Sequence, residues 1–270
     1  MTIQSDRCRV FHELHASGCF VIPNPWDVGS ARALVSLGFK AVATTSSGFA
    51  WSTGRPDHGV PLDGMLAHCR AIAAGVDVPV SADFEGGFAI EPEDVAVNVA
   101  AATTTGIAGL SIEDSTGDAG EPLYKRALAI ARIRAARQAI DASGTPVLLT
   151  GRSEGFIAGR PDLKETIARL IAYAEAGAEC LHAPGLQRRE DIAEVVRAVA
   201  PRPVNVLVWS GFTTVRELED LGVRRISVGG ALARAAWTGF LRAAKDIAQQ
   251  GTFTALGESI TGPEMNRLFG

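Results

Sequence analysis

The stretch Pro79-Val80-Ser81-Ala82-Asp83-Phe84-Glu85-Gly86-Gly87 joins a short apolar strand to two carboxylates and two glycines. Side chains two positions apart on a strand share a face, so Asp83 and Glu85 are predicted to point into one pocket if the strand continues that far. The glycines allow the backbone to turn sharply just beyond them. Acidic side chains are rarely buried at the end of an apolar strand without a partner. A metal ion would explain both acids, and a structural ion pair is the alternative.

Apolar runs of the strand type alternate with Ala-, Leu- and Arg-rich helical patterns along the whole chain. The eight candidate strands cover residues 20–23, 41–44, 78–82, 110–112, 147–150, 180–182, 204–208 and 225–228. Helical patterns include residues 27–37, 92–103, 124–142, 163–175, 189–199, 214–221 and 232–249. Eight βα units with apolar, parallel strands predict a (β/α)8 TIM-type barrel of the α/β class. A doubly wound open sheet is the runner-up, but no GxGxxG turn follows the first strand.

The 270-residue chain contains no linker or low-complexity segment, so residues 1–270 are predicted to form a single barrel domain. Residues 251–270 lie beyond the last barrel helix, contain one more helical pattern at 263–268, and have no barrel strand to follow. This segment is predicted to be an oligomerisation tail that packs on another subunit.

Composition restricts the classes of partner. The net charge is −4 and no basic run occurs, which argues against nucleic acid or an anionic membrane as a partner. No apolar run reaches the roughly 18 residues that a membrane-spanning helix needs, and no signal-peptide pattern follows the N-terminus. The four cysteines are widely spaced without a CxxC motif, which is typical of free thiols in a reducing compartment. A cytoplasmic location is therefore expected.

Charged side chains follow three consecutive strands of the predicted barrel, at the end where barrel enzymes carry their chemistry. Asp83 and Glu85 follow the third strand, Glu113 follows the fourth, and Arg152 follows the fifth. The acids offer only hard oxygen ligands, which suits Mg²⁺ or Mn²⁺ and not zinc. Such an ion could chelate a 2-oxo acid and stabilise the enolate that forms when a bond to C3 breaks. Arg152 would supply a fixed positive charge to the substrate carboxylate or to the enolate oxygen.

Other polar residues at the same end leave alternatives open. The segment Ser46-Ser47-Gly48 could present backbone N–H groups to the substrate carboxylate. His182 ends the sixth strand and is equally well explained as an active-site group or as a satisfied histidine in the barrel mouth. Asp114 adjoins Glu113 and is expected to point the opposite way.

These motifs together resemble the isocitrate lyase/phosphoenolpyruvate mutase superfamily. The resemblance runs from about residue 20 to the final helix and rests on Asn24-Pro25-Trp26-Asp27, Ser47-Gly48, Asp83-Phe84-Glu85-Gly86-Gly87, Ile112-Glu113-Asp114 and Gly151-Arg152. It implies a Mg²⁺-dependent barrel that makes or breaks C–C or P–C bonds next to a 2-oxo acid. It also implies dimers or tetramers in which the last barrel helix is swapped between subunits.

The resemblance further implies a role for each matching residue. Ser47, Gly48 and Phe49 are expected to form the backbone cradle for the substrate carboxylate, and Asp57 is expected to be the acid near the metal and the substrate. Asp83 is the expected direct metal ligand, and Glu85 and Glu113 are expected to act on the metal through water. Arg152 matches the substrate-binding arginine, and His182 matches the histidine of the mutase branch. The family often carries Asp at the position of Glu85, so this chain keeps the charge on a longer side chain.

The loop after Glu113 departs from the lyase pattern. Isocitrate and methylisocitrate lyases carry a Lys-Lys/Arg-Cys-Gly-His segment there, whose cysteine is the catalytic acid or base. Residues 115–122 of this chain read Ser-Thr-Gly-Asp-Ala-Gly-Glu-Pro and hold no Cys, His or Lys. A true isocitrate or methylisocitrate lyase is therefore not expected, although the loop could still close over a substrate.

Three functions remain open on the sequence. The first is a Mg²⁺-dependent enzyme that cleaves a C–C bond in a small 2-oxo or 2-hydroxy acid, as a lyase or hydrolase. The second is an enzyme that breaks or shifts a P–C bond, which His182 favours and the missing lid lysine disfavours. The third is a 2-oxo acid binding protein with little turnover, since the loop lacks the Cys, His or Lys of a competent acid or base.

Overall fold

A computed structural model describes residues 2–269 of the chain. Eight parallel strands form one sheet in the order β1-β8-β7-β6-β5-β4-β3-β2, and Ala43 N–H donates to Pro23 O at 3.0 Å where β1 and β2 meet. The strands are β1 Phe20–Ile22, β2 Val42–Ala43, β3 Val80–Asp83, β4 Gly109–Glu113, β5 Leu148–Arg152, β6 Cys180–His182, β7 Val204–Leu207 and β8 Arg225–Ser227. The predicted (β/α)8 barrel is confirmed.

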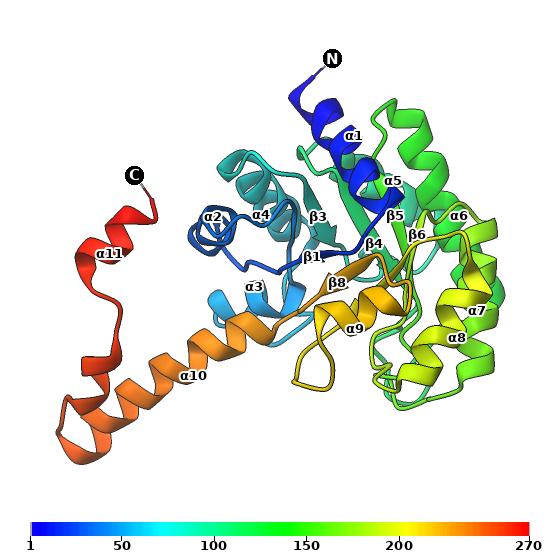
Figure 1. Cartoon of the computed structure of the whole chain (residues 1–270). Coiled ribbons are helices and arrows are strands. Elements are labelled where there is room, and N and C mark those ends of the chain that lie inside the picture. Colours follow the sequence, from blue (N-terminus) through cyan, green and yellow to red (C-terminus); the bar gives the residue numbers. More distant parts are fainter. Residues whose placement is uncertain (1, 270) are drawn as a thin grey trace.

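Helices surround the sheet, as Figure 1 shows. They are α1 Ile3–Ala16, α2 Val28–Ser36, α3 Ser46–Ser52, α4 Leu62–Gly75, α5 Pro92–Thr103, α6 Arg126–Ser143, α7 Leu163–Glu175, α8 Arg189–Val199, α9 Val215–Asp220, α10 Ala231–Lys245 and α11 Gly262–Arg267. Several of them stop at a glycine with positive φ, as the sequence predicts: φ is 91° at Gly38, 90° at Gly106, 109° at Gly177 and 84° at Gly222. Glycine adopts this conformation without the steric cost that a Cβ imposes.

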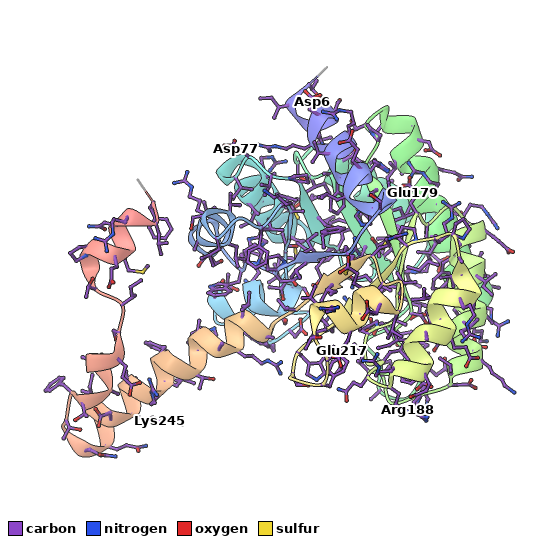
Figure 2. All side chains as sticks on the ribbon, viewed as in Figure 1. Asp6, Asp77, Glu179, Arg188, Glu217 and Lys245 are labelled. Atoms are coloured by element: carbon purple, nitrogen blue, oxygen red, sulfur yellow. The ribbon has the colours of Figure 1, made fainter. Side chains whose placement is uncertain are left out.

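The strand direction places every βα loop at one end of the barrel. In Figure 2 the labelled Asp77 and Glu179, which precede β3 and β6, lie on one side of the molecule, and Arg188 and Glu217 lie on the opposite side. Arg188 follows β6 and Glu217 follows β7, so this second side carries the C-terminal ends of the strands. Helix α1 lies toward the other end, where buried Phe11 packs against Gly109 at the start of β4.

The chain after the last strand leaves the barrel. Helix α10 extends outward and is followed by the short helices η1 Asp246–Gln250 and η2 Thr254–Glu258 and by α11 (Figure 1). The segment exposes large apolar side chains, namely Phe240, Leu241, Ile247, Phe253, Leu256, Ile260, Met265 and Phe269. Among residues 2–269, no helix combines the length and the apolar character that crossing a lipid bilayer requires.

Candidate active site at the C-terminal ends of the strands

A cavity of about 170 Å³ opens at the C-terminal ends of the strands. Five of the residues singled out from the sequence line it, and they come from the loop after β2 and from the ends of β3, β5 and β6: Ser47, Asp57, Asp83, Arg152 and His182. Glu85 and Glu113 line a second cavity of about 300 Å³, together with Ser115, Thr116 and Gly117 of the loop that follows β4. The barrel thus brings together side chains that lie far apart in the sequence.

The guanidinium group of Arg152 joins the acids of neighbouring strands. Its Nη1 lies 3.1 Å from Asp83 Oδ1 and 3.2 Å from Glu113 Oε2, and its Nε donates to Glu154 Oε1. The parallel register pairs Glu113 with Arg152, so the two strand ends lie side by side. Burial alone lowers the pKa of Arg152, but the carboxylates of Glu154, Glu113 and Asp83 together raise it well above its usual value. The guanidinium is therefore a permanent positive charge.

The second carboxylate oxygen of Asp83 is held by the start of α3. Ser46 donates to Asp83 Oδ2 from its backbone N–H at 3.0 Å and from its hydroxyl at 2.9 Å. Thr45 caps the same helix, because its hydroxyl accepts the N–H of Gly48 at 3.3 Å. Asp83 is consequently fixed from two sides, by Ser46 and by Arg152.

Glu85 does not share the face of Asp83. Strand β3 ends at Asp83, and Glu85 has a φ of 48°, so the strand does not continue far enough for alternation to point both acids into one pocket. Glu85 Oε2 instead lies 3.0 Å from His58 Nδ1. The hydrogen bond to Glu85 raises the pKa of His58 to about 9 against the opposing effect of burial, so this imidazole is protonated at neutral pH.

The pKa of Glu113 shows that several negative charges lie close together at the site. Its side chain is buried, and burial raises its pKa to about 8 although Arg152 opposes the shift, while Glu154 and Asp83 add to it. Buried carboxylates that raise one another's pKa are stabilised by a cation. Within residues 2–269, no three Asp, Glu, His or Cys side chains converge as a ready-made ligand set. The acids at the site offer only oxygen donors, which is the chemistry that a hard cation such as Mg²⁺ prefers, and Mg²⁺ usually keeps several waters.

The expected carboxylate cradle is only partly at the cavity. Ser47 lines it, whereas Gly48 and Phe49 lie in the first turns of α3 and use their N–H groups within the helix, for Thr45 Oγ1 and Thr45 O. The ring of Phe49 stacks on His68 with a centroid separation of 3.7 Å.

Asp114 points away from the cavity, as expected. Its carboxylate accepts from Tyr173 Oη at 2.6 Å, from Arg169 Nη1 at 3.0 Å and from the backbone N–H of Glu154 at 2.8 Å. This buried network fixes the end of β4 against the residues after β5, and so holds Glu113 and Arg152 in register.

Two groups at the site were given no role from the sequence: His58 pairs with Glu85, and Asn205 contacts His182. Ser46 was expected in the carboxylate cradle, but its N–H and hydroxyl hold Asp83. His58 directly neighbours the predicted residue Asp57, which was the available signal. Asn205 interrupts an otherwise apolar strand, and a polar residue inside a barrel strand is itself a signal.

A (β/α)8 barrel with buried carboxylates around a fixed arginine at the C-terminal ends of its strands has the architecture of a barrel enzyme. The family model described as phosphoenolpyruvate phosphomutase matches residues 11–248. The chain belongs to this family, and with it to the phosphoenolpyruvate mutase/isocitrate lyase superfamily, as the sequence motifs indicated.

Solved structures of the superfamily cover nearly the whole chain. The structure of a protein from Burkholderia cenocepacia J2315 is 47% identical, covers 99% of this chain and 98% of its own, and superimposes with a TM-score of 0.96. A 2,3-dimethylmalate lyase is 27% identical over 100% of this chain and 95% of its own, with a TM-score of 0.85. Oxaloacetate acetylhydrolase with its product oxalate is 25% identical over 98% of this chain and 94% of its own, with a TM-score of 0.87. The relatives thus include a lyase and a hydrolase, and the family model describes a mutase.

Proposed function

We propose that the protein is a Mg²⁺-dependent enzyme that cleaves a C–C bond in a small 2-oxo or 2-hydroxy carboxylic acid, as a lyase or hydrolase, through an enolate. The observation that carries the proposal is Arg152, whose guanidinium lies 3.1 Å from Asp83 and 3.2 Å from Glu113 beside the cavity. The cavity of about 170 Å³ is of a size for a small acid and not for a large cofactor. The named lyase and hydrolase relatives support the same reaction class.

Each residue has a definite task in this proposal. Asp83 would hold the metal directly, with Glu85 and Glu113 acting through water, and Mn²⁺ would serve in place of Mg²⁺. When bound, the ion supplies Lewis-acid polarisation of the 2-oxo group. Arg152 attracts the substrate carboxylate and the developing enolate oxygen, because its charge is permanent and its position is fixed by carboxylates on both sides.

The remaining predicted residues complete the pocket. Ser47 would orient the substrate carboxylate, with Gly48 and Phe49 behind it in α3, and Asp57 would act as an acid near the metal and substrate. The loop 115–122 would cover the reaction, since it is tied at its base by Thr116 N–H to Pro122 O at 3.0 Å while its tip is exposed. This loop offers no Cys, His or Lys, and its titratable side chains are the carboxylates of Asp118 and Glu121.

A P–C bond-breaking or phosphonomutase reaction is the second candidate. The family model's description and the position of His182 on the cavity support it. Binding of a 2-oxo acid with little turnover is a third candidate of another class, since the cavity and carboxylates would suffice for it.

One NMR screen separates the three candidates. The full-length protein is incubated with Mg²⁺ and, in turn, oxaloacetate, dimethylmalate, methylisocitrate, phosphonopyruvate and 2-oxoglutarate. We expect Mg²⁺-dependent cleavage of a carbon acid that stops when EDTA removes the metal. Release of phosphate from phosphonopyruvate would establish the second candidate instead. Thermal stabilisation by these acids without product would establish the third.

We also propose that the apolar segment after the barrel packs against a second copy of the chain, giving a dimer or tetramer. Phe240 is 60% exposed and Phe253 is 66% exposed, which is costly for aromatic side chains unless a partner covers them. Light scattering of Phe240→Asp is expected to show a smaller assembly than the wild type, with Lys245→Ala as the control on the same helix. A wild type that is monomeric at all concentrations would contradict this proposal.

The four free cysteines, three of them buried, support a reducing compartment such as the cytoplasm for this protein.

A further inference from the structure

A chain of hydrogen bonds inside the barrel leads from a buried arginine to His182. Arg225 Nε donates to Asn205 Oδ1 at 2.9 Å, and Asn205 Nδ2 lies 3.0 Å from His182 Nδ1 and 2.9 Å from Ser227 Oγ. The four residues come from the adjacent strands β6, β7 and β8, whose register pairs His182 with Asn205 and Asn205 with Arg225. All four side chains line the cavity.

Arg225 fixes which way the amide of Asn205 faces. A guanidinium group only donates hydrogen bonds and keeps its proton in proteins, so the atom that faces Arg225 Nε must be the amide oxygen. The amide nitrogen must then face the other way, with one N–H toward Ser227 Oγ and the other toward His182 Nδ1. Turning the amide over would bring two donors together at 2.9 Å.

The amide in turn selects the tautomer of His182. A donor N–H aimed at Nδ1 requires a lone pair there, so the proton of the neutral ring must be on Nε2. The backbone oxygen of Asn205 also lies 3.1 Å from Nδ1 and could accept a hydrogen bond from a protonated Nδ1. A proton on Nδ1 would, however, place two hydrogen-bond donors against each other, because the side-chain N–H of Asn205 points at the same nitrogen. A carbonyl with one unused lone pair costs less than two opposed donors in a buried site.

The charges around His182 keep the ring neutral. Burial, followed by the positive charges of Arg152 and Arg225, lowers its pKa well below the usual value. Within residues 2–269, Arg225 has no carboxylate partner; its other contacts are Thr150 Oγ1 at 3.1 Å and His15 Nε2 at 3.3 Å. His15 is also kept neutral, because burial and next the charge of Arg225 lower its pKa to about 3. Its Nδ1 lies 2.7 Å from Phe11 O.

We propose that Arg225 and Asn205 are positioning residues that hold His182 as the neutral Nε2–H tautomer, so that His182 presents a hydrogen-bond donor to the substrate. No group among residues 2–269 hydrogen-bonds to Nε2, and His182 lines the cavity, so this N–H is free to meet a carboxylate, enolate or phosphoryl oxygen. His182 cannot take up a proton at Nε2 as a general base, because that nitrogen already carries one. The catalytic consequence rests on the proposed function, whereas the tautomer does not.

The tautomer is measured directly by two-bond ¹H–¹⁵N correlation NMR on the full-length protein labelled with ¹⁵N-histidine. The wild type is expected to show the protonated type of ¹⁵N shift at Nε2 of His182 and the unprotonated type at Nδ1, without change from about pH 5 to about pH 8. His182→Gln identifies the signal. A wild-type ring protonated at Nδ1 would overturn the proposal, whether or not the protein proves to be an enzyme.

A substitution of nearly equal shape tests the positioning role. In Asn205→Asp a carboxylate would still accept from Arg225 but would also accept from His182, so the ring proton is expected to move from Nε2 to Nδ1. Ser227→Ala removes the other partner of the amide nitrogen and is expected to leave the tautomer unchanged. If turnover is established, Asn205→Asp should lower kcat by about 10²-fold or more. A folded Asn205→Asp that retains the Nε2–H signal would refute the positioning role.

Discussion

Replacing Arg152 with leucine is expected to lower kcat/KM for a 2-oxo acid by about 10²- to 10³-fold, as the loss of one fixed electrostatic group at an active site does. The guanidinium is the shared partner of Asp83, Glu113 and Glu154. Its removal would take away the charge that attracts the substrate and leave three carboxylates facing one another in a buried place. Steady-state kinetics with saturating Mg²⁺ measures the effect, and circular dichroism shows whether the variant is folded.

Arg152→Lys is the matched control for this experiment. Lysine keeps the charge but loses the planar fork that reaches two carboxylates at once, so we expect an intermediate loss that falls mainly on kcat. A folded Arg152→Leu that retains activity within about tenfold of the wild type would show that the arginine serves the fold and not the reaction.

Replacing Asp83 with asparagine is expected to abolish turnover and weaken Mn²⁺ binding by about 10- to 100-fold or more, since even partners of metal ligands contribute that much. Asparagine keeps the shape of the side chain and still accepts from Ser46, so the start of α3 should stay in place. The amide nitrogen would then face Arg152 Nη1, so the loss reports the missing negative charge together with the lost ion pair to Arg152. Titration of the protein with Mn²⁺, followed by electron paramagnetic resonance, measures the affinity.

Asp114→Asn provides the comparison, because Asp114 is a buried acid at the end of β4 that faces away from the cavity. The Asp114→Asn variant loses the ion pair between this residue and Arg169. The free energy of unfolding of the variant should therefore fall by about 3–5 kcal/mol, as when one partner of a buried pair is removed. The folded variant should nevertheless bind Mn²⁺ with the wild-type affinity. If Asp83→Asn and Asp114→Asn weakened Mn²⁺ binding equally, the metal would not contact Asp83.

The barrel was predictable because its signals are local and repeated. Each apolar run is short, several helices between them end at a glycine, and the spacing leaves few topologies for eight parallel strands. The positions of Asp83, Glu113 and Arg152 at successive strand ends followed from that architecture alone, since parallel strands end at the same side of a barrel.

Details that depend on contacts across strands were not predictable from the sequence. Alternation in β3 assumed an extended backbone through Glu85, but the strand ends at Asp83 and the left-handed conformation of Glu85 turns its carboxylate toward His58. The link from Arg225 through Asn205 to His182 depends on the barrel's register, which no single stretch of sequence encodes.

We propose that the carboxylates around Arg152 bind a divalent metal ion beside the cavity at the barrel's C-terminal end. Anomalous diffraction from crystals of the wild-type protein soaked with Mn²⁺ and oxalate would locate this ion. We expect one anomalous peak within coordination distance of Asp83, with oxalate between that peak and Ser47. No peak at Asp83, or a peak at another cluster of acids, would contradict it.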